Sequence, residues 1–425
     1  MSLDTPRHVK YWQRCFKSIL PHHYTSMDSS RLALGYFILG GLDLLFSTLS
    51  ASVTTEPLIP KADRKRLRDW ILSLQHRYGG FCGSPHHVFP ESFEKGFDHA
   101  VKPAADDTEN ANIAATAFAL LMLGIIGEDR EGVSAFRGVK RVQTLRWLRK
   151  LQRPDGSFGE FLKKDGTVGG GKDMRYCYVA AMIRWMLCGN EIPQDGPDKP
   201  RQFQDLDVDG LVGHIRRGQT FDGGIAESSM GESHAGYAYC AVAALSLLDR
   251  AEPDGDNKYL KKGIRDIPAL VHWLVARQFI YTASEDPESE SAKDEPELSA
   301  LNISESEGYV TGFNGRLNKI ADTCYTWWVF GALRLLDKAQ PGTAKAINRA
   351  PSRSFLLEKT QHPVLGGFGK HAERPPDVYH SYMGLAALET MAGEDGEEGV
   401  SLFDAGLCIS SDAAARIEVA RRFWN

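Results

Sequence analysis

A short glycine turn recurs along this 425-residue chain, and its repetition constrains the fold more than any other feature. The turn usually follows a glutamine by a few residues. Its five copies read LQHRYGGFCG, LQRPDGSFG, GQTFDGGIAE, EGYVTGFNG and TQHPVLGGFG, around Gly79, Gly156, Gly223, Gly312 and Gly366. Glycine at these positions is expected to provide positive-φ turns between helices. Repetition of one unit predicts a structure assembled from copies of one supersecondary element.

Each turn lies between two helical patterns of different character. The preceding segments, such as RKRLRDWILSLQ and IPALVHWLVARQ, place apolar residues at three- and four-residue steps, which predicts amphipathic helices. The following segments are apolar nearly all round, which predicts buried helices. They read NIAATAFALLMLG, MRYCYVAAMIRWML, HAGYAYCAVAALSLL, TCYTWWVFGALRLL and YHSYMGLAALETM. The chain is therefore expected to be all-α and built from repeated helical hairpins.

Two architectures fit such hairpins, an open solenoid and a closed barrel of two concentric helix layers. Repetition alone does not distinguish them. A closed barrel would gather the starts of the inner helices around one cavity, and the unusual polar residues lie near those starts. One domain, 1–425, is predicted, with a flexible insertion at about 283–307, where the sequence is acidic and poor in apolar residues.

Composition and charge exclude several classes of protein. The net charge of −5 and the lack of a long basic tract argue against a nucleic-acid partner. Seven scattered cysteines without a CxxC pair predict reduced thiols and a cytoplasmic location. The N-terminus is charged throughout, and the longest apolar run is interrupted by Asp43, so neither a secretory signal nor a transmembrane segment is expected.

The segment GRLNKIADTCYTWW, from Gly315 to Trp328, contains the first candidate metal ligands. Asp322 and Cys324 offer one oxygen and one sulfur, a mixed pair that suits Zn²⁺. Arg316 and Lys319, expected to lie one helical turn apart, would place cations beside that metal and so suit a diphosphate. The segment alone equally allows Asp322 to cap a helix and Cys324 to be a small core residue.

His380, in DVYHSYMGLAAL, is the natural third ligand for a zinc ion that Asp322 and Cys324 would also bind. Three protein ligands leave one coordination position open, which is typical of a catalytic site. Asp377, three residues earlier, is expected to hold the imidazole from the outer side.

Further candidates lie at the starts of other inner helices, and each has an ordinary structural alternative. Ala33 and Phe37 would border a pocket or serve close helix packing. Arg175, with Tyr178, is expected to be buried at the start of an otherwise apolar helix, which implies an internal salt bridge or an anionic ligand. His234 opens a helix that adds Tyr237 and Cys240 at helical spacing, and its repeat position matches that of GRLNK.

The motifs GRLNK, ADTCYTWW, ESHAGY and DVYHSY, in this order, closely resemble the β subunits of protein prenyltransferases. The resemblance extends from about His8 to the last inner helix. It implies a closed barrel of six inner and six outer helices, paired with a helical-repeat α subunit. It also implies transfer of an isoprenoid from its diphosphate to a cysteine near a protein C-terminus.

The resemblance assigns roles to most of the candidates. It implies that Asp322, Cys324 and His380 bind zinc, and that Arg175 lies near the peptide carboxylate and the lipid. The residues expected around the diphosphate are His234, Arg316, Lys319 and Tyr325; those expected along the lipid channel are Tyr237, Cys240 and Trp328; Tyr176 and Tyr379 are expected at the acceptor pocket.

Two positions resemble the type I geranylgeranyltransferases more than the farnesyltransferases. Lys370 stands where farnesyltransferases have an aspartate that helps bind Mg²⁺, so no Mg²⁺ requirement is expected, although an exposed turn lysine is the simpler alternative. Ala33 stands where farnesyltransferases have a bulky tryptophan, and a small residue admits a longer lipid. The resemblance thus implies geranylgeranyl diphosphate as donor and, as acceptors, C-terminal CaaX peptides, X mainly Leu, of Rho- and Rap-like small GTPases.

Other functions are less well supported. A farnesyltransferase β subunit is the main alternative. A terpene cyclase would share the helical barrel, but the chain lacks a DxDD motif. A non-catalytic scaffold would explain the repeats without requiring aligned metal ligands and cations.

Overall fold

A computed structural model describes residues 1–49, 58–85, 111–127, 134–163, 165–189, 204–251, 255–281, 309–393 and 396–422. The predicted insertion at 283–307 lies outside the described residues. Helices dominate these ranges, and each of the short sheets is a two-stranded antiparallel pair. The pairs are β1 (Phe161–Leu162) with β2 (Val168–Gly169), β3 (Gln278–Ile280) with β4 (Thr311–Phe313), and β5 (Phe403–Asp404) with β6 (Ile409–Ser410).

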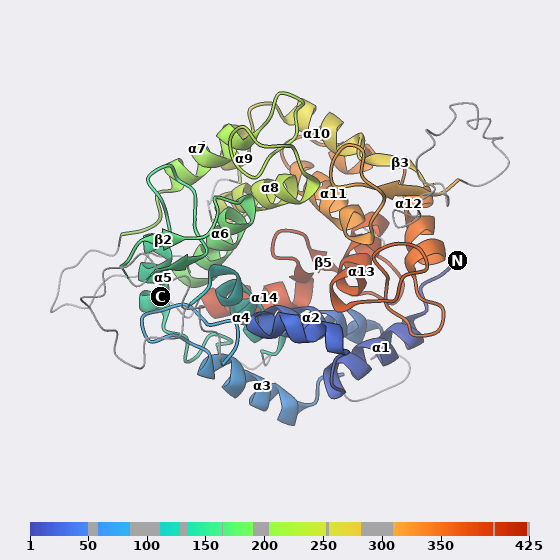
Figure 1. The fold of residues 1–425 in the computed structure, drawn as a ribbon, viewed down its shortest axis with the longest axis horizontal. Helices are drawn as coiled ribbons and strands as arrows, with labels where there is room; N and C mark the ends of the chain where they lie inside the picture. Colours follow the sequence, from blue (N-terminus) through green and yellow to red (C-terminus); the bar gives the residue numbers. More distant parts are fainter. Residues whose placement is uncertain are drawn as a thin grey trace.

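Six helices of the described chain form an inner ring (Figure 1). Each packs on the next, and the last packs against the first, so the ring is closed. They are α2 (Arg31–Leu49), α4 (Ile113–Ile125), α6 (Met174–Cys188), α8 (Ala235–Arg250), α11 (Thr323–Leu336) and α13 (Val378–Ala392). The predicted all-α closed barrel is confirmed, and the open solenoid is excluded.

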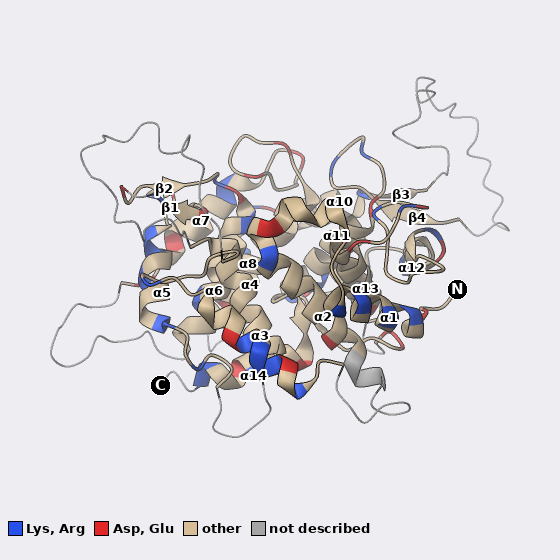
Figure 2. Cartoon of the chain, turned by 60° about the horizontal axis from the view of Figure 1, so that its bottom comes forward, with Lys and Arg blue, Asp and Glu red and all other residues tan. Residues whose placement is uncertain are grey.

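An outer layer of amphipathic helices surrounds this ring. Leu145 and Leu148 of α5 are buried, for example, while Lys150 on the same helix is exposed. Figure 2 shows charged residues along α3 on the outer wall. The outer helices are α1 (Thr5–Lys17), α3 (Lys61–Ser73), α5 (Arg141–Lys150), α7 (Val208–Gly218), α10 (Ile267–Val275) and α12 (Arg349–Ser354), which continues into the π-helical η5 (Phe355–Thr360). The described chain also contains the short helices η1 (His22–Ser30), α9 (Lys258–Gly263) and η4 (Thr343–Lys345).

The repeated glutamine connects each hairpin to the next. In four copies its side-chain oxygen accepts the backbone N–H of the residue that caps the next outer helix, at 2.6–3.0 Å. The pairs are Gln75 with Lys140, Gln152 with Asp207, Gln219 with Asp266, and Gln361 with Asp4. The last pair joins residues 357 positions apart and closes the outer layer. The repeat therefore encodes the contact between neighbouring units.

The repeated glycines act at the same junctions. Gly156 has a φ of +84°, and a Cβ there would lie 1.9 Å from the carbonyl oxygen of Gly210 in the next outer helix. Gly223 has a φ of +92°, and a Cβ there would likewise lie too close to the carbonyl oxygen of Ala269. The expectation is wrong for the fourth copy, because Gly312 lies within β4 and lacks a positive φ. The β3–β4 hairpin makes that connection instead.

Acidification is expected to destabilise the fold at the junction where the layers close. His8 of α1 is fully buried, with Nε2 3.1 Å from Oε1 of Gln361 and its ring 4.8 Å from that of Phe368. Burial lowers the pKa of His8 to about 4, against 6.5 for an ordinary histidine. Between these values only the unfolded chain binds the proton, so up to about 3 kcal/mol of stability is lost as pH falls from 6.5 to 4.

Thermal unfolding midpoints at pH 7.5 and pH 5 measure this loss. The His8→Phe variant should show a smaller decrease between the two pH values than the wild type. A matched control, His22→Phe, alters an exposed histidine and should keep the wild-type decrease. Equal decreases in wild type and His8→Phe would exclude His8 as the source.

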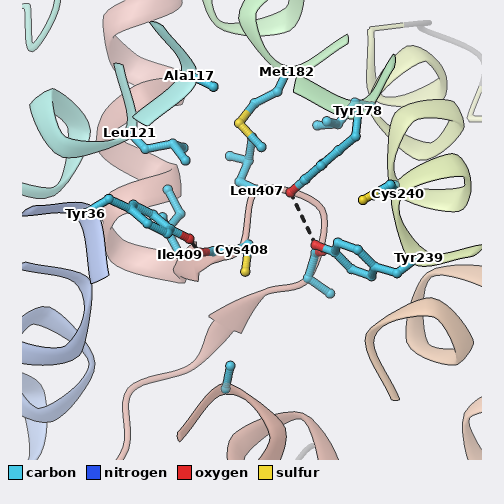
Figure 3. Packing of buried hydrophobic residues seen from close by; sticks show 14 of the residues in the cluster. Tyr36, Ala117, Leu121, Tyr178, Met182, Tyr239, Cys240, Leu407, Cys408 and Ile409 are labelled. Carbon is cyan, nitrogen blue, oxygen red and sulfur yellow. Dashed lines mark hydrogen bonds between the residues drawn. The ribbon is translucent and has the colours of Figure 1, made fainter. Parts of the chain in front are cut away.

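The β5–β6 hairpin lies among the inner helices (Figure 3). Tyrosine hydroxyls from inner helices donate to its backbone: Tyr178 to Gly406 at 2.9 Å and Tyr239 to Ala405 at 2.8 Å. The following helix, α14 (Ser411–Arg422), packs against α4 and α6. Arg421 of α14 donates to carbonyls at the C-terminal end of α6. The hairpin therefore enters from the C-terminal ends of the inner helices, opposite the polar helix starts.

None of the helices in the described ranges combines the length and apolar character needed to cross a membrane.

Candidate metal centre and anion site

The chemically unusual side chains cap the N-termini of the inner helices. Asp322 Oδ1 accepts the N–H of Cys324 at 2.8 Å, Asp377 Oδ1 accepts that of His380 at 2.9 Å, and His234 Nδ1 accepts that of Gly236 at 3.1 Å. A carboxylate or imidazole at such a position satisfies a backbone donor that the helix leaves unpaired. The capping interpretation of Asp322 is therefore correct, and it is compatible with a second role.

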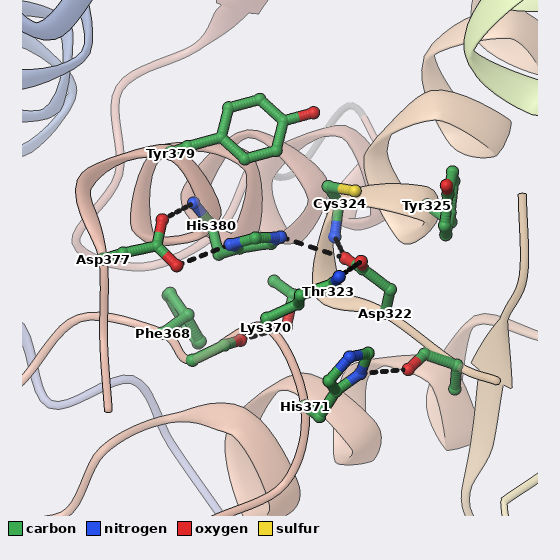
Figure 4. Close-up of polar contacts among 12 residues, drawn as sticks. Asp322, Thr323, Cys324, Tyr325, Phe368, Lys370, His371, Asp377, Tyr379 and His380 are labelled. Carbon is green, nitrogen blue, oxygen red and sulfur yellow. Dashed lines mark hydrogen bonds and ion pairs between the residues drawn. The ribbon is translucent and has the colours of Figure 1, made fainter. Parts of the chain in front are cut away.

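Asp322, Cys324 and His380 form a compact buried cluster (Figure 4). One ligand atom from each lies within 4.8 Å of the other two, and this is the one such group found among the described residues. His380 Nε2 lies 3.3 Å from Asp322 Oδ1. One carboxylate, one thiol and one imidazole fit a zinc site with an open fourth position.

Asp377 holds the His380 ring in one orientation. Its Oδ2 lies 2.6 Å from Nδ1 of His380, and because a carboxylate accepts hydrogen bonds, Nδ1 carries a proton. Nε2 is then directed at Asp322 and Cys324. The expected role of Asp377 therefore agrees with its position.

These side chains shift one another's pKa values. Burial opposes protonation of His380, but hydrogen bonds to Asp322 and Asp377 raise its pKa to about 9. Burial acts to raise the pKa of Asp322, but the contact with His380 lowers it overall. Burial and the adjacent Asp322 carboxylate raise the pKa of the Cys324 thiol. A divalent cation is the group that would favour the charged form of both acidic ligands.

Among the described lysines and arginines, Lys370 forms an ion pair with the cluster. Its Nζ lies 3.9 Å from Asp322 Oδ2, and its side chain is 54% exposed. It is thus a turn lysine with access to solvent and also a neighbour of a candidate metal ligand. An anion that reached this lysine would lie beside the metal position.

Three of the other expected diphosphate ligands, His234, Arg316 and Tyr325, lie around the start of α8. His234 Nε2 is 3.2 Å from the Tyr325 hydroxyl, and burial together with the charges of Arg316 and Arg175 lowers the pKa of His234. Arg316 forms an ion pair with Glu232. The expectation that Arg316 and Lys319 are one helical turn apart is wrong. They lie in the connection before α11, where Asn318 adopts a φ of +57°.

Arg175 is not buried, contrary to expectation. Its side chain is 65% exposed and pairs with Asp173, the cap of α6, at 2.5 Å. Its guanidinium lies 6.0 Å from the centre of the Tyr237 ring. The salt-bridge alternative is therefore correct, and the solvent-exposed face stays accessible to an anion.

Aromatic side chains connect the expected lipid and peptide positions. Phe37 meets Tyr379 edge-on at 5.4 Å, and Trp328 Nε1 donates to the Tyr379 hydroxyl at 3.2 Å. Trp328 also lies 5.0 Å from Tyr239, ring centre to ring centre. Ala33, on α2, lies one helical turn before Phe37. These contacts bring α2, α8, α11 and α13 together along one aromatic wall.

The remaining expected lining residues lie on neighbouring helices. Tyr178 and Cys240 are buried on α6 and α8, and the Tyr178 hydroxyl is 3.2 Å from that of Tyr239. The Tyr176 hydroxyl donates instead to Glu160 at 3.1 Å. Sequence reasoning missed Glu160, Asp173 and Glu232, the acidic partners. Asp173 had a detectable signal, since an aspartate directly before a helical run predicts a cap.

Comparison with known proteins places the chain in a family. The model of the prenyltransferase alpha-alpha toroid domain matches residues 3–409. The geranylgeranyl transferase type-1 subunit beta of Arabidopsis thaliana is 27% identical over 411 residues, which cover 94% of this chain and 87% of that protein. The protein farnesyltransferase subunit beta of Pyricularia oryzae is 27% identical over 403 residues, which cover 91% of this chain and 63% of that one.

Among solved structures, Candida albicans protein geranylgeranyltransferase-I complexed with GGPP is similar, with a TM-score of 0.70 and 25% identity. The match covers 99% of both chains. A closed double ring of helices with polar caps at one end is the architecture of an alpha-alpha toroid. The chain belongs to the prenyltransferase alpha-alpha toroid family. Within it, both the Arabidopsis relative and the Candida structure are geranylgeranyltransferases of type I.

Proposed function

We propose that this chain is the β subunit of a heterodimeric, zinc-dependent protein geranylgeranyltransferase of type I. It would transfer geranylgeranyl from its diphosphate to the cysteine of C-terminal CaaX sequences, X mainly Leu, in Rho- and Rap-like small GTPases of the cytoplasm. The observation that carries this proposal is the buried Asp322–Cys324–His380 cluster with Lys370 Nζ 3.9 Å from Asp322. Similarity to type I relatives and to a structure holding GGPP supports the choice of lipid.

Asp322, Cys324 and His380 would hold the zinc ion, and Asp377 would keep His380 in the tautomer that binds metal. Bound zinc would favour the nucleophilic thiolate form of the acceptor cysteine at neutral pH. The surrounding protein would keep the metal position buried, at the end of the aromatic wall.

The diphosphate would lie across the cations at the starts of α8 and α11. Negative charge builds on the diphosphate as the carbon–oxygen bond breaks, and preorganised donors stabilise charge where it develops. The donors proposed for this role are His234, Arg316, Lys319, Tyr325 and Lys370. Because Lys370 brings a fixed positive charge to the place of a Mg²⁺ ligand, catalysis is expected without Mg²⁺.

The lipid would extend along the aromatic wall, and the peptide would lie beside it. Aromatic rings bury large apolar areas, and their negative faces also suit the partly cationic carbon that reacts. Ala33, Phe37, Tyr178, Tyr237, Cys240 and Trp328 are proposed to line the lipid, and Arg175, Tyr176 and Tyr379 to contact the peptide.

A transfer assay tests the function directly. The chain is co-expressed with a prenyltransferase α subunit of the same organism, since the family resemblance implies that it acts in a heterodimer. Transfer from geranylgeranyl and farnesyl diphosphates to peptides ending in Leu or Ser is measured with and without Mg²⁺. We expect Mg²⁺-independent geranylgeranylation of the Leu peptide, and none with the α subunit alone.

The farnesyltransferase alternative is supported by the 27% identity to the Pyricularia β subunit. It predicts Mg²⁺-dependent farnesylation of the Ser peptide, which would overturn the type I assignment and keep the zinc site. A stable, zinc-containing heterodimer without transfer from either lipid would overturn the proposed enzyme function.

A further inference from the structure

Two backbone segments are tied together on both sides of Asp322 (Figure 4). The Thr323 hydroxyl donates to the carbonyl of Gly369 at 2.6 Å, and the Thr323 N–H donates to that of Lys370 at 3.0 Å. His371 Nδ1 lies 2.8 Å from the carbonyl oxygen of Ala321. We call these three hydrogen bonds the clamp.

The clamp places Lys370 opposite Asp322 with little freedom. Lys370 is the middle residue of the segment from Gly369 to His371, and Asp322 is the middle residue of the segment from Ala321 to Thr323. Asp322 is also held from its other side, because its N–H donates to the carbonyl of Phe313 in β4 at 3.1 Å. Lys370 Nζ lies 3.9 Å from Asp322 Oδ2, and hydrogen bonds hold the backbone of both residues in place.

Both side chains of the clamp are suited to this role. Thr323 is fully buried, so its hydroxyl needs a partner, and it donates to a carbonyl of the opposite segment. The carbonyl of Ala321 only accepts hydrogen bonds, so neutral His371 carries its proton on Nδ1 and donates. Neither side chain is among the candidate ligands of metal, lipid or peptide.

We propose that Thr323 and His371 are positioning residues that fix the anion-binding Lys370 against the metal ligand Asp322. The inference rests on the proposed function. If the proposal is correct, the affinity for zinc and the affinity for the lipid diphosphate both depend on the clamp. Weakening the clamp then lowers both affinities. A lysine on a free loop would influence diphosphate binding alone.

The test uses the heterodimer with Thr323→Val, which keeps the shape of threonine and removes the hydroxyl. Zinc affinity is measured by competition with a chelator, and geranylgeranyl diphosphate affinity by equilibrium titration without peptide. We expect each affinity to fall about 10-fold, the lower end of the loss seen when an outer partner of a metal ligand is removed. Thr323→Ser keeps the hydroxyl donor. Its affinities for zinc and for geranylgeranyl diphosphate should therefore stay within about twofold of the wild-type values.

Lys370→Met is the matched control. It removes the cation and leaves the clamp backbone intact, so diphosphate affinity should fall while zinc affinity does not. His371→Phe provides a second disruption if Thr323→Val fails to fold, with the same paired loss expected.

The outcomes separate the clamp from the proposed function. Wild-type heterodimer that binds no zinc would end the proposed zinc-dependent function and the inference with it. Wild type that binds zinc, with unchanged affinities in Thr323→Val or in a folded His371→Phe, would overturn the clamp alone. Loss of diphosphate affinity without loss of zinc affinity would also overturn it.

Discussion

Replacing Cys324 by alanine is expected to remove zinc from the purified heterodimer and to abolish measurable transfer. Cys324 is 5% exposed and supplies the thiol of the three-ligand cluster. Its loss leaves one carboxylate and one imidazole, too few for a stable zinc site. Removing an outer partner of a ligand already costs 10–100-fold in metal affinity or activity, so removing a ligand should cost more than about 100-fold.

Metal content per heterodimer, measured by mass spectrometry, and transfer rate together check this expectation. His380→Ala should behave in the same way, whereas Asp377→Asn keeps all three ligands and should show the smaller loss of about 10–100-fold. Cys188→Ala is the control, since it removes a buried thiol at the C-terminal end of α6. Full zinc content in Cys324→Ala would place the metal elsewhere.

Replacing Ala33 by tryptophan is expected to shift the preferred donor from the twenty-carbon to the fifteen-carbon lipid. Ala33 lies one turn before Phe37, whose ring packs edge-on against Tyr379. An indole there would occupy the space proposed for the last isoprene unit. Burial of each CH₂ contributes about 0.8 kcal/mol, so excluding five carbons changes the ratio of kcat/KM values by about 100-fold or more.

The ratio of kcat/KM for geranylgeranyl and farnesyl diphosphates is the measurement. Ala33→Ser keeps a small side chain and should preserve the wild-type preference. Zinc content should be unchanged in both variants, because Ala33 lies on α2 and the cluster on α11 and α13. A tryptophan variant that still prefers the longer lipid would show that another residue determines the depth of the pocket.

Local backbone conformation and short-range ion pairing explain two errors of the sequence reasoning. The spacing of Arg316 and Lys319 suits a helical turn, but these residues lie in the connection from β4 to α11, and the left-handed residue Asn318 stands between them. Arg175 was expected to be buried because its helix is apolar, but it lies in the first turn, where Asp173 holds it at the surface.

The amino-acid sequence by itself determined the helical repeats, the turns between them and the residue types of the candidate metal site. These features depend on local periodicity and on the chemistry of single side chains, which a sequence displays directly. Four of the five glycine turns and the buried character of the inner helices followed from that information.

Only the tertiary structure decided that the ring closes and which side chains meet inside it. Closure depends on the packing of α13 against α2 and on the bond from Gln361 to Asp4, 357 residues apart. The cluster likewise needs His380 to reach Asp322 from a different helix, and Lys370 to reach it from a third segment. Such distances are set by the sum of many helix contacts, so no local pattern in the sequence specifies them.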